Sequence, residues 1–211
     1  MTLEKRRIEG LLALVGVQLC FGFSPLFAKW TLLSATNPGG FTPRALVAWR
    51  IVFGALCLGG LAAWKHPREL RAARAELPLL ALCGVLGIAL NMWLYMEGVQ
   101  RTNVVHVGLL VVQIPVFTYA LACLVKIERA QRWRVLGIAV ALCGAIVLVL
   151  ERAPDHVGES STLGNLLVVA NCFSYAIYLV LARGLLQRYP TLVVVAWVFW
   201  LSLPAVPLFF F

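Results

Sequence analysis

Seven apolar runs, each close to the length of a membrane span, follow one another along this chain and are separated by polar segments. They lie at Leu11–Ala28, Ala45–Trp64, Leu77–Met96, Val104–Val125, Val135–Leu150, Leu163–Ala182 and Leu192–Phe211. A helix needs about 20 apolar residues to cross the hydrocarbon core of a bilayer, whereas barrel strands alternate strictly over about 10 residues, which these runs do not. We therefore expect an all-α fold, a polytopic transmembrane helical bundle with seven spans.

The composition supports lipid as the solvent of this chain. Hydrophobic residues make up 62% and charged residues 13% of the 211 residues, and the mean hydropathy is +0.90. A soluble domain is about 45–50% apolar and about 25% charged. This excess of apolar surface excludes a secreted disulfide scaffold, a disordered chain and a nucleic-acid-binding domain. The six cysteines lie inside the apolar runs without a CxxC or Cys/His spacing, so neither a disulfide nor a metal site is expected.

The basic residues indicate the orientation of the bundle. The formal net charge is +9, and 13 of the 18 Lys and Arg residues fall in alternate polar segments, at 1–10, 65–76, 126–134 and 183–190. Because short loops rich in Lys and Arg stay on the cytoplasmic side, we expect a cytoplasmic N-terminus and an outside C-terminus. The chain would be a multi-pass protein of a bacterial cytoplasmic membrane. Anionic lipid headgroups account for the basic loops, so the bilayer and not nucleic acid is the expected partner.

An early part of the sequence resembles a later part at two places, and the two matches occur in the same order. Residues 10–30 align with residues 164–184, and both segments begin with glycine and contain Ala followed by a basic residue near their ends. Further on, Val-Ala-Trp at 47–49 matches Val-Ala-Trp at 195–197. Five spans separate the two starts, so the second copy would be inserted upside down. Inverted repeats of this kind occur in many secondary transporters, whose substrate site lies near the membrane midplane between the repeats.

An ordered set of short motifs resembles a known family. The set consists of Phe21-Gly22-Phe23-Ser24-Pro25, Pro43 and Arg50, the stretch NMWLYMEGV at 91–99 with Arg101-Thr102-Asn103, Pro115, Glu128-Arg129, and Leu136-Gly137 with Leu142-Cys143-Gly144. This set extends over residues 8–200 and resembles the EamA-type drug/metabolite transporter superfamily. The resemblance implies ten spans in two inverted five-helix EamA repeats, with both termini cytoplasmic, and transport of small metabolites, often amino acids.

The resemblance also implies domain boundaries. Residues 8–150 would form the first EamA repeat with spans one to five, 151–162 an extracytoplasmic linker, and 163–211 a partial second repeat with spans six and seven. The sequence departs from the family pattern because it ends at Phe211 within the second repeat. We expect the chain to be a fragment of a longer protein. The alternative is that a second copy of the chain, as a homo-oligomer, or a partner subunit supplies the remaining spans.

Polar side chains deep in a bilayer are costly, so those inside the runs are candidates for substrate contact. Three amides lie near the middle of their runs, two tyrosines share a helix face with one of them at spacings of four and seven, and an Asn–Tyr pair lies on the outer third of run three. These candidate substrate-binding residues are Gln18, Asn91, Tyr95, Gln113, Asn171, Tyr175 and Tyr178. Amides and phenols suit a polar organic solute. The alternative is that they hydrogen-bond between helices as packing contacts.

Candidate gating residues are prolines and charges within or beside the spans. Pro25 and Pro115 cannot donate to the helical hydrogen-bond ladder and would free a carbonyl four residues earlier. Arg50 lies inside the second run, and we expect it to pair with Glu97 on the outer side; the alternative is that Arg50 extends to the lipid phosphates. Small residues predict close helix packing on run five (Gly137, Ala141, Gly144), at Gly84 with Gly87, and at Ala55 with Gly59.

The function expected from these features is transport. The chain would carry a small polar metabolite, such as an amino acid or a related compound, outward by alternating access, with no cofactor. Two alternatives remain: a truncated, non-transporting subunit that assembles with or regulates another membrane protein, and a lipid-linked sugar flippase. We expect no enzyme and no catalytic residues, because the sequence has no P-loop, no lysine after Lys126 for a Schiff base, and Asp155 as its only aspartate.

Overall fold

The computed structural model describes residues 3–32, 37–129, 131–150 and 161–209, and this part of the chain consists of helices joined by short connections. Its α-helices are α1 (Leu3–Thr31), α2 (Pro43–Lys65), α3 (Pro67–Ala72), α4 (Leu77–Gly84), α5 (Leu90–Arg101), α6 (Val104–Val111), α7 (Ile114–Leu124), α8 (Arg132–Leu150), α9 (Thr162–Arg188) and α10 (Thr191–Ser202). Two 3₁₀ segments, η1 (Ala73–Glu76) and η3 (Leu203–Phe209), and one π-helical segment, η2 (Val85–Ala89), join or extend them. The all-α expectation is confirmed.

Five helical stretches of the described residues are long and apolar enough to cross a membrane. They run from Pro43 to Lys65, Pro67 to Arg101, Val104 to Leu124, Thr162 to Arg188 and Thr191 to Phe209. These stretches contain runs two, three, four and six and most of run seven, and they define a polytopic helical membrane protein. Helices α1 and α8 contain the first and fifth runs, and their crossing stays a prediction. Residues 151–160 of the expected linker 151–162, and the last residue Phe211, lie outside the described residues.

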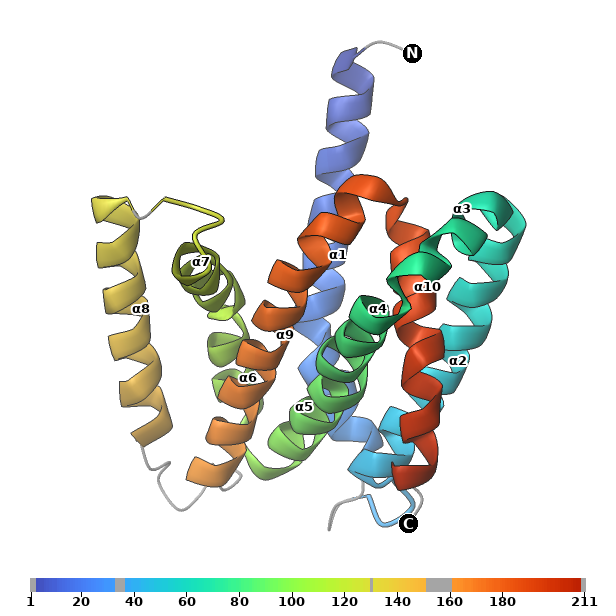
Figure 1. Cartoon of the computed structure of the whole chain (residues 1–211). Helices are drawn as coiled ribbons and strands as arrows, with labels where there is room; N and C mark the ends of the chain where they lie inside the picture. Colours follow the sequence, from blue (N-terminus) through green and yellow to red (C-terminus); the bar gives the residue numbers. More distant parts are fainter. Residues whose placement is uncertain (1–2, 33–36, 130, 151–160, 210–211) are drawn as a thin grey trace.

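The long helices lie side by side, and the two ends of the chain lie at opposite ends of the bundle (Figure 1). The start of α1, helix α3, the α7–α8 connection and the α9–α10 turn all lie at one end, the upper end in Figure 1. These are the four segments that hold most of the Lys and Arg residues. The arrangement therefore places the basic segments together, as the orientation by charge requires.

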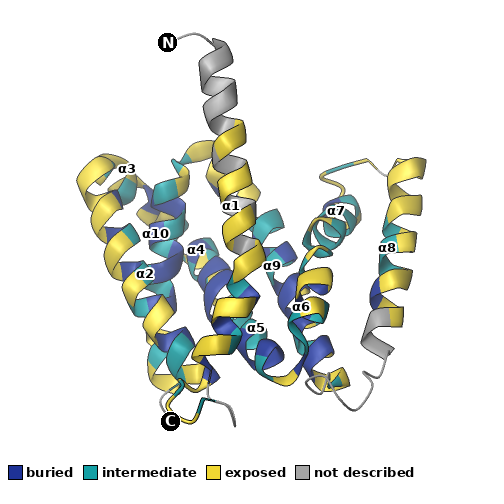
Figure 2. Cartoon of the chain, turned by 180° about the vertical axis from the view of Figure 1, so that it is seen from behind, coloured by how far each residue is buried: buried dark blue, intermediate teal, exposed yellow. Residues whose placement is uncertain are grey.

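The core lies where α9 and α10 meet the third span. Helix α9 packs along α5 and α7, while α10 packs between α2 and α4. Buried residues are concentrated on α4, α5, α9 and α10, whereas α1, α2 and α8 expose much of their surface (Figure 2). Small residues allow these contacts as expected: a side chain at Gly84 would meet the main chain of α10, and one at Gly59 would meet the Trp200 ring. The expected strip on α8 makes no such contact, because a Cβ at Gly137 or Gly144 would meet open space.

Three of the expected continuous spans change helix type or are interrupted. The fourth run breaks between α6 and α7, because Pro115 in the first turn of α7 has no N–H to continue the ladder. The seventh run tightens to 3₁₀ at Leu203, one residue before Pro204. The third run contains the π-helical segment η2, which no proline marks in the sequence. Such segments leave main-chain groups to be satisfied by neighbouring helices.

Candidate functional site

An open cavity of about 680 Å³ lies between α2, α5 and α10. Four of its lining side chains come from one side of α2, and the others come from the segment before α2, from α5 and from α10. They are Phe41, Leu46, Trp49, Arg50, Phe53, Met92 and Phe199. The wall is therefore apolar and aromatic apart from one guanidinium. We call this space the Arg50 cavity.

Local sequence explains how α2 presents Arg50 to the cavity. Pro43 sits in the first turn, and the Thr42 side chain accepts a hydrogen bond from Ala45 N at 3.2 Å, which caps the helix. Arg50 follows seven residues after Pro43, about 10 Å along the axis at 1.5 Å per residue. The Trp49 and Phe53 rings stack with centroids 5.6 Å apart, one turn apart on the same side of α2.

A glycine on α2 shapes the wall opposite these rings. A Cβ at Gly54 would lie 2.2 Å from a carbon of the Phe199 ring. Only glycine leaves room for the ring of α10 to rest against the backbone of α2. Gly54 thus sets how far Phe199 extends into the cavity.

Tyr95 of α5 links the surroundings of the Arg50 cavity to a fourth helix, α1. Its phenol shares a hydrogen bond with the Ser24 side chain of α1 and lies within electrostatic reach of the Arg50 guanidinium. Among the described residues, Arg50 itself makes no ion pair. Tyr95, expected to contact substrate, is therefore the one sequence candidate that the structure brings to Arg50.

The expected pair between Arg50 and Glu97 is wrong. The buried Glu97 carboxylate accepts a hydrogen bond from Arg101 one turn further along α5. Lys29 likewise has other partners, since its Nζ donates to the main-chain oxygens of Val99 at 3.2 Å and Thr102 at 2.7 Å. Residues four apart on a helix face one another, so Arg101 reaches Glu97 without crossing to another helix.

Asn91 and Asn171 meet across the α5–α9 interface. The amide Nδ2 of Asn91 donates to the main-chain oxygen of Asn171 at 3.1 Å, and Nδ2 of Asn171 donates to the main-chain oxygen of Asn91 at 2.9 Å. Both amides thus tie two helices together. This geometry supports the packing alternative for the pair, and their contact with a substrate stays a prediction.

The remaining sequence candidates are spread over the bundle. Tyr175 and Tyr178 lie with ring centroids 5.4 Å apart, and Tyr178 is buried where a Cβ at Gly87 would touch its ring. Gln113 lies at the break between α6 and α7, where Nε2 donates to Ala141 O of α8 at 3.1 Å while the buried Oε1 has no hydrogen-bond partner among the described residues. The side chain of Gln18 lies outside the described residues. Pro25 is buried within α1.

Two serine hydroxyls donate hydrogen bonds to main-chain oxygens in or next to the π-helical segment. Ser174 Oγ donates to Leu86 O at 2.7 Å, and the Ser202 hydroxyl is shared between Gly84 O at 3.0 Å and Val198 O of its own helix at 2.7 Å. The Leu86 and Gly84 carbonyls lie in or next to η2, so α9 and α10 each place one hydroxyl on the irregular turn. Irregular turns of this kind are frequent at functional sites in membrane and soluble helices.

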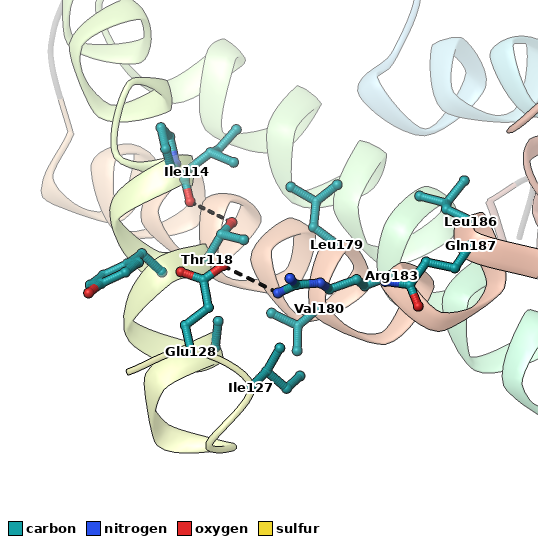
Figure 3. Close-up of a pocket in the computed structure, with 12 residues that line it drawn as sticks. Ile114, Thr118, Ile127, Glu128, Leu179, Val180, Arg183, Leu186 and Gln187 are labelled. Carbon is teal, nitrogen blue, oxygen red and sulfur yellow. Dashed lines mark hydrogen bonds and ion pairs between the residues drawn. The ribbon is translucent and has the colours of Figure 1, made fainter. Parts of the chain in front are cut away.

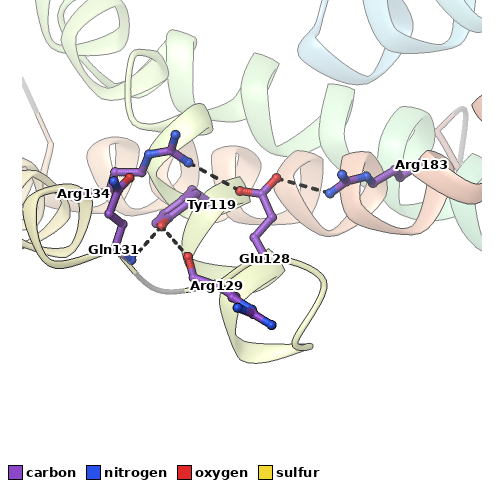
Figure 4. A network of polar contacts seen from close by, with 6 residues as sticks. All are labelled: Tyr119, Glu128, Arg129, Gln131, Arg134 and Arg183. Carbon is purple, nitrogen blue, oxygen red and sulfur yellow. Dashed lines mark hydrogen bonds and ion pairs between the residues drawn. The ribbon is translucent and has the colours of Figure 1, made fainter.

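A second cavity, of about 580 Å³, lies between α7 and α9 at the end of the bundle that carries the basic segments (Figure 3). The Glu128 carboxylate closes one side of this cavity, where it accepts a hydrogen bond from Arg183 of α9 at 3.2 Å. The same carboxylate lies 3.9 Å from Arg134 of α8, and the Tyr119 hydroxyl bridges Arg129 O and Gln131 N (Figure 4). The α7–α8 connection is thereby held to both neighbouring helices.

Lys126 explains how the chain turns Glu128 toward Arg183. It has a φ of 60°, and the N–H groups of Lys126 and Ile127 donate back to Cys123 O and Ala122 O. This is a left-handed end of α7 of the kind that glycine usually supplies. The turn directs the connection back over the cavity.

Replacing Glu128 by glutamine should loosen this connection without unfolding the protein. Partly exposed ion pairs contribute about 0–1 kcal/mol, so global stability should change by less than about 1 kcal/mol. Trypsin cleavage after Lys126 and Arg129 should rise several-fold, measured by mass spectrometry of fragments from inside-out vesicles. Glu69→Gln, which removes an exposed contact to His66 at 3.7 Å on α3, is the control. Cleavage equal to that of the control would contradict the assignment.

Substitution of Asn91 and Asn171 tests the two hydrogen bonds between α5 and α9. Each side chain donates to a main-chain oxygen that the other substitution leaves in place. Asn91→Ala and Asn171→Ala should therefore each lower the free energy of unfolding by about 0.6–2 kcal/mol, and the double variant should lose nearly the sum. Unfolding in mixed micelles measures all three. A strong coupling between the two substitutions would contradict independent bonds.

Sequence reasoning missed most of the Arg50 cavity. Trp49 and Phe53 flank Arg50 at helical spacing, and that spacing was a signal available in the sequence. Met92 and Phe199 come from other helices, so only the fold brings them together. Ser174 and Ser202 carried no signal, because nothing in the sequence marks η2. No group of three His, Cys, Asp or Glu side chains placed to hold a metal ion occurs in the described part of the chain.

The fold and its cavities define a polytopic helical membrane protein with solute-sized spaces between its spans. The EamA-like transporter family matches residues 8–150, and the chain belongs to this family of drug/metabolite transporters. The family consists of transporters and not of enzymes. No solved structure matches the chain at a significant level.

Three curated relatives illustrate the similarity. A WAT1-related protein of Arabidopsis thaliana is 24% identical over 87% of this chain and 53% of its own length. The protein named “Uncharacterized transporter YdfC” of Bacillus subtilis is 26% identical over 87% of this chain and 60% of its own. The “Probable terminal-alkyne amino-acid exporter” of Streptantibioticus cattleyicolor is 31% identical over 64% of this chain and 44% of its own. The chain spans about half the length of the curated relatives that it matches.

Proposed function

We propose that this protein exports a small polar metabolite, an amino acid or a related compound, by alternating access. Membership of the EamA-like transporter family carries the proposal. The name of the relative from Streptantibioticus cattleyicolor, an amino-acid exporter, supports the substrate class. The membrane would be the bacterial cytoplasmic membrane, with the basic end of the bundle inside.

The inverted repeat is part of this proposal, with units at 8–150 and 163–211 joined by 151–162. The helices matched by sequence, α1 with α9 and α2 with α10, run in opposite directions across the bundle (Figure 1). Within the Val-Ala-Trp match, Ala48 and Ala196 are both fully buried. Opposed direction and equal burial at matched positions support two inverted units. In this proposal, α1 and α8 are the first and fifth of seven spans.

Counterflow in proteoliposomes tests transport directly. Vesicles that contain the purified chain and are preloaded with unlabelled amino acid should accumulate external labelled amino acid faster than protein-free vesicles. If a folded, helical preparation shows no counterflow of amino acids or small organic acids, the transporter proposal fails and the non-transporting subunit takes its place.

The intact mass of the protein in its native membrane tests how the second repeat is completed. A mass near 23.2 kDa would require a second copy or a partner subunit for a ten-helix transporter. A mass about 8–10 kDa larger would correspond to three more spans with their loops on the same chain.

A further inference from the structure

The Arg50 cavity places one cation among aromatic side chains inside a spanning helix. Arg50 lies about 10 Å along α2 from its first residue, at 1.5 Å per residue. Trp49, Phe53 and Phe199 line the same space. A charge within a span is costly unless it has a partner, and such residues commonly mark a substrate path.

The described residues offer Arg50 no anion. None of the five ion pairs in this part of the chain includes Arg50, and Glu97 is engaged by Arg101. The nearby phenol of Tyr95 is a neutral group and shares a hydrogen bond with Ser24. The described residues thus leave the Arg50 guanidinium open to an anion from outside them.

We propose that the Arg50 cavity binds the carboxylate of a small amphipathic organic acid or amino acid. The guanidinium would receive the carboxylate in a two-pronged contact, a geometry that Arg provides and Lys does not. The apolar part of the ligand would rest against the stacked Trp49 and Phe53 rings and against Phe199. This assignment rests on the proposed function and gives its substrate class a defined anchoring group.

The size and lining of the cavity set what it should select. Its volume of about 680 Å³ exceeds that of an amino acid with an aromatic side chain, and small-molecule sites span about 300–1,000 Å³. None of the described residues that line the cavity carries a carboxylate, so among them an ammonium group would find aromatic faces and apolar side chains. The site should therefore require the carboxylate strictly and the amine only weakly.

Binding of labelled phenylalanine to the purified chain in phosphatidylcholine nanodiscs tests the charge. Arg50→Gln should weaken binding roughly 10-fold to 100-fold, as expected for loss of a charge-assisted contact. Arg50→Lys should retain part of the affinity. Arg44→Gln removes an equal charge about one and a half turns earlier on α2, at a position that is exposed, as Arg50 is, but does not line the cavity, and it should leave binding unchanged.

Competition by analogues tests the chemical group. Phenylpropionate, which keeps the carboxylate and lacks the amine, should displace labelled phenylalanine within about threefold of phenylalanine itself, since an exposed cation–aromatic contact is weak. Phenylalaninamide, which lacks the carboxylate, should compete at least tenfold less well. Equal competition by the amide, or unchanged binding in Arg50→Gln, would overturn the proposal.

Gly54 tests the aromatic wall independently of charge. A Cβ at this position would force the Phe199 ring to move, since the two atoms would lie 2.2 Å apart. Gly54→Ala should weaken binding of phenylalanine more than that of alanine, whereas Gly60→Ala, where nothing lies within 4 Å, should change neither. Equal behaviour of the two variants would overturn the assignment of the aromatic wall.

Three further outcomes separate this proposal from others. Loss of phenylalanine binding in nanodiscs that contain phosphatidylglycerol would assign Arg50 to a lipid headgroup and overturn it. If binding follows Arg50 but sealed vesicles show no counterflow, the transport function fails and the carboxylate site stands. If counterflow occurs and is equal in wild type and Arg50→Gln, the carboxylate site fails and transport stands.

Discussion

Replacing Gly164 by alanine is expected to destabilise the protein strongly, because the first turn of α9 rests directly on the end of α5. A Cβ at Gly164 would lie 2.7 Å from both the carbonyl carbon and the oxygen of Arg101. These are main-chain atoms, which cannot rotate away as a side chain can. We expect the free energy of unfolding to fall by about 1–3 kcal/mol, the usual cost of overpacking, measured by unfolding in mixed micelles.

The same substitution elsewhere on α9 provides the control. A Cβ at Gly184 would meet nothing within 4 Å. Alanine is favoured over glycine inside a helix by about 1 kcal/mol, so Gly184→Ala should be neutral or stabilising. If Gly164→Ala behaves like Gly184→Ala, the close approach of α9 to α5 is not present in the membrane.

Removing Arg101 is expected to cost more than removing its partner. The Glu97 side chain is 11% exposed, whereas the Arg101 side chain is 42% exposed. Arg101→Gln leaves a buried carboxylate without a counter-ion and should lower the free energy of unfolding by about 1–3 kcal/mol, less than for a fully buried pair. Glu97→Gln leaves an arginine that can reach water or lipid headgroups and should cost less than about 1 kcal/mol.

The double variant Glu97→Gln/Arg101→Gln should recover most of the stability lost in Arg101→Gln. The counterflow rate of the Glu97→Gln variant shows whether the Glu97–Arg101 pair only stabilises the fold or also gates transport. An unchanged counterflow rate fits the structural pair, whereas a large change in rate without a change in stability would return Glu97 to a gating role. Equal destabilisation by the two single variants would contradict the asymmetry of burial.

The Arg50 cavity and the α7–α9 cavity lie in different parts of the bundle. The α7–α9 cavity lies near the basic end and is closed on one side by Glu128 and Arg183. The Arg50 cavity lies nearer the start of α2, toward the opposite end (Figure 1). The π-helical turn η2 lies on the third span, which packs against both α9 and α10 between these two spaces.

The sequence by itself determined the helices and the side on which their connections lie. Helix formation in a membrane follows from local apolar length, because every main-chain group must be satisfied within its own segment. The first residues of α2, α6 and α9 therefore fall within two residues of the starts of the apolar runs at Ala45, Val104 and Leu163. The break before α7 follows from Pro115 alone, since a missing N–H is a local property.

Only the tertiary structure decided the partners of the polar side chains. Sequence spacing cannot tell whether Asn91 and Asn171 face a solute or each other, because that depends on which helices pack together and at what height. For the same reason Glu97 was paired with Arg50, although Arg101 lies one turn away on its own helix. The aromatic wall formed by Phe199 and the hydroxyl that Ser174 donates to η2 arise from contacts between segments far apart in the chain. Such contacts are set by packing, and packing is a property of the whole bundle.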